Sequence, residues 1–328
     1  TGNPEYLHWA RHGLAYLEKA HFQTRHQGYA WTLRDGKVED PTHHCYGLAF
    51  VLLAYAEAYR AGIDEAYEGI GRVHAMLDKR FWEPQWQRFA DEADEHWNLS
   101  DYRGQNANMH GCEALIAAFE ATGEARYLDR GDEVTRQFTV TLTEAAEGQV
   151  WEHYTEDWQH DWTYNIDKPD DLFKPWGFQP GHQVEWAKLL LQLDMHRPAD
   201  WHLATAKRLY DLAMTRGWDD QYGGLVYGYA PDGSFADAHK YFWVHAEAIA
   251  TAWRLYDRTG EVLYRADYDR LWGWSWDHLV DHKHGAWYRI TTREGDWLEP
   301  YKSPAGKVDY HTMGACWDVL SVMRKAGG

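Results

Sequence analysis

Histidine and glutamate side chains recur along this chain, each time near the start of an apolar stretch. The histidine position of five copies is held by His43, His110, His182, Val244 and His311, with gaps of 67, 72, 62 and 67 residues. Three residues later, the same copies hold Tyr46, Glu113, Glu185, Glu247 and Gly314. Imidazoles are the usual general acids and bases at neutral pH, and neighbouring carboxylates orient the ring or bind hydroxyl groups. The repeat therefore predicts proton-transfer chemistry to which several structural units contribute.

Two copies place a histidine and a glutamate three residues apart, as His110 with Glu113 and as His182 with Glu185. This spacing puts both side chains on one helical face. Near a helix N-terminus, the partial positive charge of the backbone favours anions and lowers the pKa of a histidine. A single His-x-x-Glu is more often a capped helix with a core histidine. Its recurrence in one register favours a functional site.

Two other kinds of chemistry have weaker support. Histidines and carboxylates also bind divalent metals, so a metal site is the second alternative, but the HExxH and paired-cysteine spacings are absent. A serine or cysteine nucleophile has no G-x-S-x-G motif, and no P-loop or G-x-G-x-x-G is present.

The elements that carry these residues follow from helical spacing of apolar positions. Buried inner helices are expected within 42–58, 108–124, 180–194, 242–261 and 309–323. More polar stretches, such as 125–138 and 264–279, predict outer helices. Short alternating runs around Asp35-Gly36 and Asp232-Gly233 predict β-hairpins before two of the inner helices.

A unit of outer helix, hairpin or long loop, and inner helix predicts an all-α fold, an α/α toroid with its site where the inner helices begin and short hairpins on that side. No linker or composition break is visible, so residues 1–328 are expected to form a single domain. The loop after an inner helix repeats as Thr1-Gly2 with Tyr6, Thr122-Gly123 with Tyr127, and Thr259-Gly260 with Tyr264. The chain is therefore expected to begin mid-unit and to lack the first helix pair of a six-unit ring.

Composition narrows the range of partners. A net charge of −18 argues against nucleic acid and anionic membranes, and no apolar run is long enough to span a bilayer. The first residues lack the features of a signal peptide. Cys45, Cys112 and Cys316 form no even-numbered framework, so buried reduced thiols in a cytoplasmic protein are expected. The 20 Trp, 22 Tyr and 20 His suit a pocket that stacks on sugars and moves protons.

Two strings carry a resemblance to a known family. RGQNANMH at 103–110 and PGHQVEW at 180–186, with Trp243, Glu247-Ala248 and Tyr310-His311, resemble the N-acylglucosamine 2-epimerase superfamily, in particular its mannose isomerase branch. The likeness runs in order along essentially the whole chain. It implies an (α/α)6 barrel that uses no metal and no cofactor.

Carried over by position, the resemblance implies that His182 and His311 are the catalytic acid/base pair. It implies sugar-binding or orienting roles for Glu185, Glu247, Asn106, His110, Tyr46 and Trp243. There are two departures from the family pattern: an arginine of the N-terminal helix pair has no counterpart here, and Lys307 replaces a polar amide of a related isomerase. Lys307 is therefore expected to alter contacts to the far end of the sugar.

The resulting expectation is an aldose–ketose isomerase acting on mannose and similar aldoses such as lyxose. His311 would remove the C2 proton, and His182, held by Glu185, would shuttle protons at oxygen. A 2-epimerase using the same histidines is the nearest alternative. A glycoside hydrolase using Glu185 and Glu247, or a sugar-binding protein, is more distant.

Overall fold

The computed structural model describes residues 2–302 and 309–326. Its described part contains ten α-helices joined by short strand pairs and loops. Backbone contacts divide the chain into two compact units. Unit 1 comprises Thr1–Thr141 and His153–Asp161, and unit 2 comprises Leu142–Glu152 and Trp162–Gly328.

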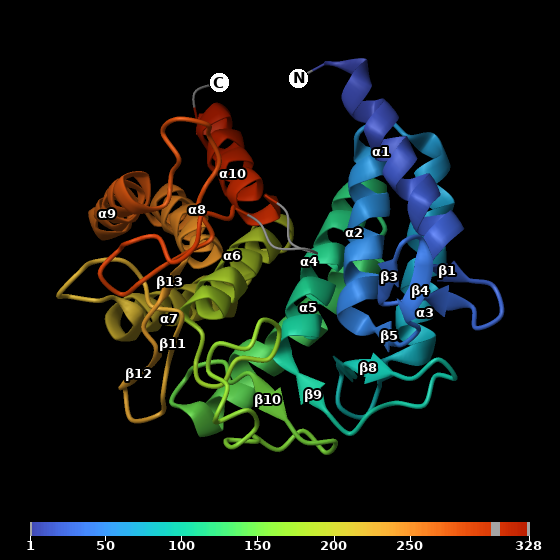
Figure 1. Cartoon of the computed structure of the whole chain (residues 1–328), viewed down its shortest axis with the longest axis horizontal. Coiled ribbons are helices and arrows are strands. Elements are labelled where there is room, and N and C mark those ends of the chain that lie inside the picture. Colours follow the sequence, from blue (N-terminus) through green and yellow to red (C-terminus); the bar gives the residue numbers. More distant parts are fainter. Residues whose placement is uncertain (1, 303–308, 327–328) are drawn as a thin grey trace. The chain divides into compact units, whose positions relative to one another are not determined.

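Unit 1 is built on two inner helices that pack side by side. Its helices are α1 (Pro4–Tyr16), α2 (Cys45–Arg60), α3 (Tyr67–Arg80), α4 (Gln105–Thr122) and α5 (Ala125–Arg136). The inner helices α2 and α4 contact each other, while α3 covers α2 and α5 covers α4 (Figure 1). Helix α1 packs on α2 but buries none of its own residues.

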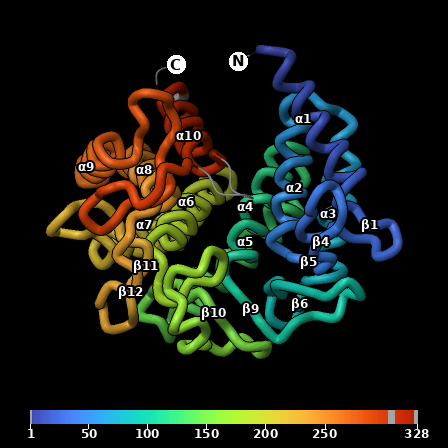
Figure 2. The backbone as a smooth tube through the Cα atoms, viewed as in Figure 1, coloured from blue at the N-terminus to red at the C-terminus, as the bar shows by residue number. Residues whose placement is uncertain are grey.

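Unit 2 repeats the same arrangement with three inner helices. Its helices are α6 (Pro180–His196), α7 (Asp200–Gly217), α8 (Phe242–Thr259), α9 (Val262–His278) and α10 (Tyr310–Ala326). Helix α8 packs on both α6 and α10, α7 packs on α6, and α9 packs on α8 (Figure 2). Helix α8 therefore brings residues of α6 and of α10 close to its own residues.

The inner helices are buried nearly all round, as their composition predicts. In α6, 14 of the 17 residues are buried, so the helix depends on packing on several sides. Helices α4 and α8 end at Gly123 and Gly260, whose φ angles of 72° and 71° give the left-handed C-cap expected from the Thr-Gly repeat.

Short antiparallel strand pairs fix where several inner helices begin. β5 (His43–His44) pairs with β8 (Glu92–Ala93), β9 (Arg103–Gly104) with β10 (His153–Tyr154), and β13 (Lys240–Tyr241) with β14 (Ile290–Thr291). The strands β5, β9 and β13 each end at the N-cap residue of the helix that follows. The ladder hydrogen bonds therefore hold the first turns of α2, α4 and α8 in place.

The remaining strand pairs include both predicted hairpins. β3 (Thr32–Arg34) and β4 (Lys37–Asp40) flank Asp35-Gly36, and β11 (Gly228–Tyr229) and β12 (Phe235–Asp237) flank Asp232-Gly233. Two further pairs join β1 (Phe22–Gln23) to β2 (Gly28–Tyr29) and β6 (Trp82–Glu83) to β7 (Arg88–Phe89).

Two composition-based expectations can be compared with the fold. Within residues 2–302 and 309–326, no helix has the length and hydropathy that crossing a membrane requires. Cys45 and Cys112 are buried, and burial raises the pKa of Cys112 to about 12. Cys316 was also expected to be buried, but it lies on an exposed position of α10.

Candidate active site

His182 lies in the first turn of α6, and a buried carboxylate holds its ring. Its Nδ1 lies 2.9 Å from both carboxylate oxygens of Glu152, a residue of the loop that precedes the helix in unit 2. Both side chains are buried. Because an ionised carboxylate only accepts hydrogen bonds, Nδ1 carries the proton and Nε2 is the nitrogen available for acid/base chemistry. The expectation that Glu185 holds His182 was wrong, since Glu152 does so.

His311 lies in the first turn of α10 and has an equivalent partner on α8. Its Nδ1 is 2.7 Å from Oε1 of Glu247, and the other oxygen of Glu247 accepts a hydrogen bond from Nζ of Lys188 on α6. Burial alone would raise the pKa of Glu247, but the Lys188 ammonium and the bond to His311 hold it below its usual value. Glu247 is therefore a buried anion held between a cation and an imidazole.

Trp243 of α8 contacts both histidine rings. Its ring centroid lies 5.1 Å from that of His182 and 5.5 Å from that of His311, with interplanar angles of 37° and 35°. Three adjacent inner helices thus place two carboxylate-bound imidazoles around one indole. An indole face is a suitable surface for the C–H side of a sugar ring.

Glu185 completes this cluster from α6, one turn after His182. It is 1% exposed, and ligand atoms of Glu185, Glu247 and His311 lie within 4.8 Å of one another. Lys188 and His311 each bond to one oxygen of Glu247, and the Lys188 ammonium would repel a divalent cation at this place.

Three predicted sugar contacts lie together in unit 1, on α2 and α4. The rings of Tyr46 and His110 meet edge to face at 5.1 Å, and His110 Nδ1 is 3.0 Å from Glu113 Oε2. Asn106 lies one turn earlier on α4. Its Oδ1 is buried and has no hydrogen-bond partner among the described residues, so it is a candidate ligand contact. Lys307 lies outside the described residues.

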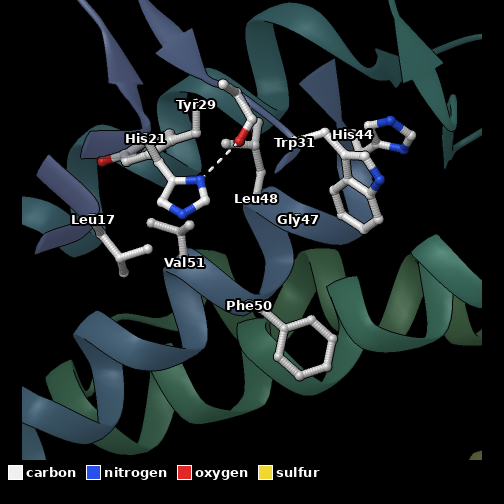
Figure 3. Close-up of a pocket in the computed structure, with 10 residues that line it drawn as sticks. Leu17, His21, Tyr29, Trp31, His44, Gly47, Leu48, Phe50 and Val51 are labelled. Atoms are coloured by element: carbon white, nitrogen blue, oxygen red, sulfur yellow. Dashed lines mark hydrogen bonds between the residues drawn. The ribbon is translucent and has the colours of Figure 1, made fainter. Parts of the chain in front are cut away.

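A pocket in unit 1 lies beside this set and not within it. It has a volume of about 260 Å³ and is lined mainly by apolar and aromatic side chains of residues 17–31 and of α2 (Figure 3). Trp31 stacks on His44 at 4.2 Å and also contacts Tyr46, 6.0 Å away. The pocket contains none of the predicted site residues.

The register read from the sequence differs from the register of the helices. His182 and His311 lie in the first turns of α6 and α10, but His110 lies a turn further into α4, and His43 precedes α2 in β5. The segments that lead into the helices differ in length, so an ungapped alignment shifts the copies. By position within its helix, His110 corresponds to Glu185 and Glu247.

Comparison with known proteins shows to which family the chain belongs. The family model described as N-acylglucosamine 2-epimerase (GlcNAc 2-epimerase) matches residues 1–315. The chain belongs to the N-acylglucosamine 2-epimerase family.

Several family members are closely similar. A D-mannose isomerase of Marinomonas mediterranea is 51% identical over 98% of this chain and 82% of its own length. A D-mannose isomerase of Thermobifida fusca is 36% identical over 92% of this chain and 75% of its own. A crystal structure of D-mannose isomerase matches with a TM-score of 0.95 at 50% identity, over 98% of this chain and 82% of that one. The match shows that the chain has the α/α-barrel type of fold predicted from its repeat.

Two residues of the candidate site were not identified from the sequence. Glu152 lies in a loop 30 residues before His182, and only the fold brings the two together. Lys188 had a visible signal, because it is a charged residue in the otherwise apolar run at 186–191. A lysine on the buried stretch of an inner helix requires a buried partner, and that partner is Glu247.

Proposed function

We propose that the chain interconverts D-mannose, and similar aldoses such as lyxose, with the corresponding ketose through a cis-enediol. The observation that carries this proposal is the pair His182 and His311, each held at Nδ1 by a buried carboxylate and each in contact with Trp243. Family membership and the similarity to proteins named D-mannose isomerase support it.

In this mechanism, His311 is the base that acts on carbon. Its Nε2 takes the proton from C2 of the open-chain aldose, and the electron pair forms the C1–C2 double bond of the enediol while O1 gains a proton. His182 moves the proton between O2 and O1 and assists ring opening at the ring oxygen. Return of the His311 proton to C1 gives the ketose, so no atom is gained or lost. Each positioned acid or base contributes typically 10²–10⁴-fold.

The remaining predicted residues are proposed to bind the sugar. Glu185, Asn106, His110 and Tyr46 offer hydrogen bonds to hydroxyl groups, and Trp243 offers an apolar face. Asn106 and His110 are also proposed to stabilise the enediolate. Lys307 remains a proposed contact to the far end of the sugar.

Proton exchange and product analysis test this function directly. The chain is incubated with D-mannose in D₂O, and sugars are followed by NMR. We expect fructose, with deuterium at C1 in those turnovers in which the proton on His311 exchanges with solvent before it returns. We expect no turnover by His311→Ala or His182→Ala variants whose circular dichroism is unchanged. Near-normal turnover by either folded variant would remove that histidine from the mechanism.

The same experiment separates the alternatives. Glucose in place of fructose would identify a 2-epimerase, and binding without a new sugar would identify a binding protein. Full activity after exhaustive chelation is expected, whereas a loss restored by Mn²⁺ or Zn²⁺ would establish a metal requirement.

The structure limits which carboxylate could be the acid of a glycoside hydrolase. A hydrolase needs one carboxylic acid with a raised pKa to protonate the leaving group. Of the two expected carboxylates, Glu247 has a lowered pKa and is bonded to Lys188 and His311. It is therefore unsuited to be the proton donor.

Two further features are proposed for the protein as a whole. We propose that residues 1–328 act as a single α/α-barrel domain. We also propose a cytoplasmic location, which the three free thiols support.

A further inference from the structure

A lysine ammonium lies buried next to the carboxylate that holds the proposed base. Lys188 is 8% exposed on α6, within a run of apolar residues that are themselves buried. Burying a lysine without a partner is costly, so a buried lysine is retained where it balances a charge. Here that charge belongs to Glu247, which is 2% exposed.

The contacts form one line from α6 through α8 to α10. Lys188 Nζ donates to Oε2 of Glu247, and Oε1 of Glu247 lies 2.7 Å from Nδ1 of His311. Among the described residues, Glu185 of α6 is a further charged group beside these contacts, because its carboxylate lies within 4.8 Å of ligand atoms of Glu247 and His311.

Two acidic residues on the other helices that pack on α8 have partners of their own. On α9, Asp267 accepts from Arg270 and Tyr210, and on α10 Asp318 pairs with Arg254. These groups serve their own ion pairs. Among the described residues, Lys188 bonds directly to Glu247 of the Glu247–His311 pair, and Glu185 lies beside that pair.

We propose that Lys188 is a positioning residue that acts through Glu247, fixing the carboxylate against His311 and setting the pH at which the Glu247–His311 pair releases its proton. The proposal rests on the function proposed above, in which His311 is the base. It adds a residue that touches no reacting atom.

The direction of the effect follows from charge balance. With the ammonium in place, Lys188 offsets the negative charge of Glu247, so the carboxylate orients the imidazole without holding a proton on it strongly. Without the ammonium, the buried anion favours an additional proton on the pair, which then persists to higher pH. A protonated imidazole cannot accept the C2 proton, so activity at neutral pH falls.

The test uses Lys188→Met, which keeps the length and removes the charge, and Lys188→Arg, which keeps the charge. Lys207→Met is the matched control, because Lys207 makes a 2.6 Å pair with Glu261 at the surface of the same unit. The His311 ring is titrated by NMR in histidine-labelled protein without sugar, with His311→Asn used to assign its signals. The pH profile of kcat/KM for D-mannose is measured in parallel.

We expect the NMR midpoint and the acid limb of kcat/KM to move up by about one pH unit in Lys188→Met. Below the midpoint, such a shift leaves about tenfold less free base, so kcat falls about tenfold while KM changes little. Lys188→Arg should recover most of the shift, and Lys207→Met should show none.

Three outcomes would decide against the proposal. An unmoved NMR midpoint in folded Lys188→Met overturns it, and so does an effect confined to KM, which would make Lys188 a sugar contact. If Lys188→Met does not fold, the double variant Lys188→Met/Glu247→Gln removes both charges and is compared with Glu247→Gln alone. A further loss of kcat in the double variant contradicts action through Glu247.

The NMR measurement keeps this inference separate from the proposed function. A shifted midpoint in a protein that converts no aldose would reject the function and leave the Lys188 assignment intact. An unmoved midpoint in an active isomerase would reject the Lys188 assignment and leave the proposed function intact.

Discussion

The two ring nitrogens of His182 and His311, the proposed catalytic pair, have different partners. Nδ1 of His182 is bound to Glu152 and Nδ1 of His311 to Glu247, so in both rings Nε2 is the nitrogen that can exchange a proton with substrate. A carboxylate in this position fixes the tautomer and stabilises the imidazolium that forms during the reaction. Both carboxylates and His182 are buried and His311 is partly buried, which strengthens the electrostatic interaction within each pair.

Glu152→Gln tests this at His182. Glutamine has nearly the same shape and its Oε1 still accepts from Nδ1, but the negative charge that stabilises a protonated ring is lost. We expect kcat on D-mannose to fall about 10²-fold with little change in melting temperature. Glu156→Gln, at an exposed position of the same segment, is the control and should keep full activity. A Glu152→Gln enzyme with wild-type kcat would show that the carboxylate is not needed for proton transfer at His182.

At the scale of residues, the sequence predicts which residues belong to the candidate site better than it predicts their hydrogen-bond partners. The repeat and the family strings indicate His182, His311, Glu247 and Trp243 as site residues, and these four lie together in unit 2. Three-residue spacing on a helix predicts Glu185 as the partner of His182. The loop carboxylate Glu152 takes that place instead, because helical spacing carries no information about loops.

At the scale of elements, the close approach of α6 and α8 depends on a missing side chain. A Cβ atom added to Gly181 would lie 2.4 Å from Cζ3 of Trp243 and 3.0 Å from a methyl of Val244. The glycine therefore allows the indole to reach His182 and His311. Its role is steric, since its backbone is ordinary α-helix.

Gly181→Ala should displace the Trp243 ring from the histidines. We expect a loss of stability of about 1–3 kcal/mol from overpacking and a fall in kcat/KM of at least about tenfold from the misplaced ring. Melting temperature and steady-state kinetics measure the two effects. Gly273→Ala on α9 is the control, because open space surrounds that position and alanine favours a helix. Unchanged kinetics in Gly181→Ala would mean that the position of Trp243 is not critical.

The elements themselves are largely predictable from sequence. Apolar periodicity locates all five inner helices, the Thr-Gly pairs locate two C-caps, and the Asp-Gly pairs locate two hairpins. The repeat does not predict how far from the start of its helix each histidine lies. Strand pairs such as β9 with β10 set where a helix begins, and they join segments about 50 residues apart in sequence.

For the whole molecule, an excess of acidic groups makes the few buried carboxylates important for stability. The chain carries 51 Asp and Glu against 33 Lys and Arg. Most acidic groups are at the surface, where single ion pairs contribute little. Asp219 of unit 2 is different: it is 1% exposed and accepts from Arg293 Nε at 2.8 Å and from Lys240 Nζ at 3.2 Å. Lys240 is itself fully buried, so each charge depends on the other.

This cluster predicts how stability changes with acid. Burial would raise the pKa of Asp219, but hydrogen bonds from Arg293, the backbone and Lys240 lower it to about 2 from an ordinary value of 3.8. A carboxyl whose pKa is lowered on folding contributes stability that is complete above its unfolded pKa and disappears as the pH falls through the folded one. The contribution of Asp219 should therefore be constant from neutral pH to about 5 and decline between about 4 and 2.

Asp219→Asn isolates that contribution, because asparagine keeps the shape and removes the charge that Lys240 requires. We expect the variant to be less stable than wild type by about 3 kcal/mol at pH 7, as for other buried pairs that lose one partner. The difference in melting temperature should shrink as the pH falls from about 4 to 2, since protonation removes the same charge from the wild type. Asp220→Asn, at the exposed neighbouring position, should match wild type at every pH. A difference between Asp219→Asn and wild type that stays constant down to pH 2 would show that the Asp219 charge does not stabilise the fold.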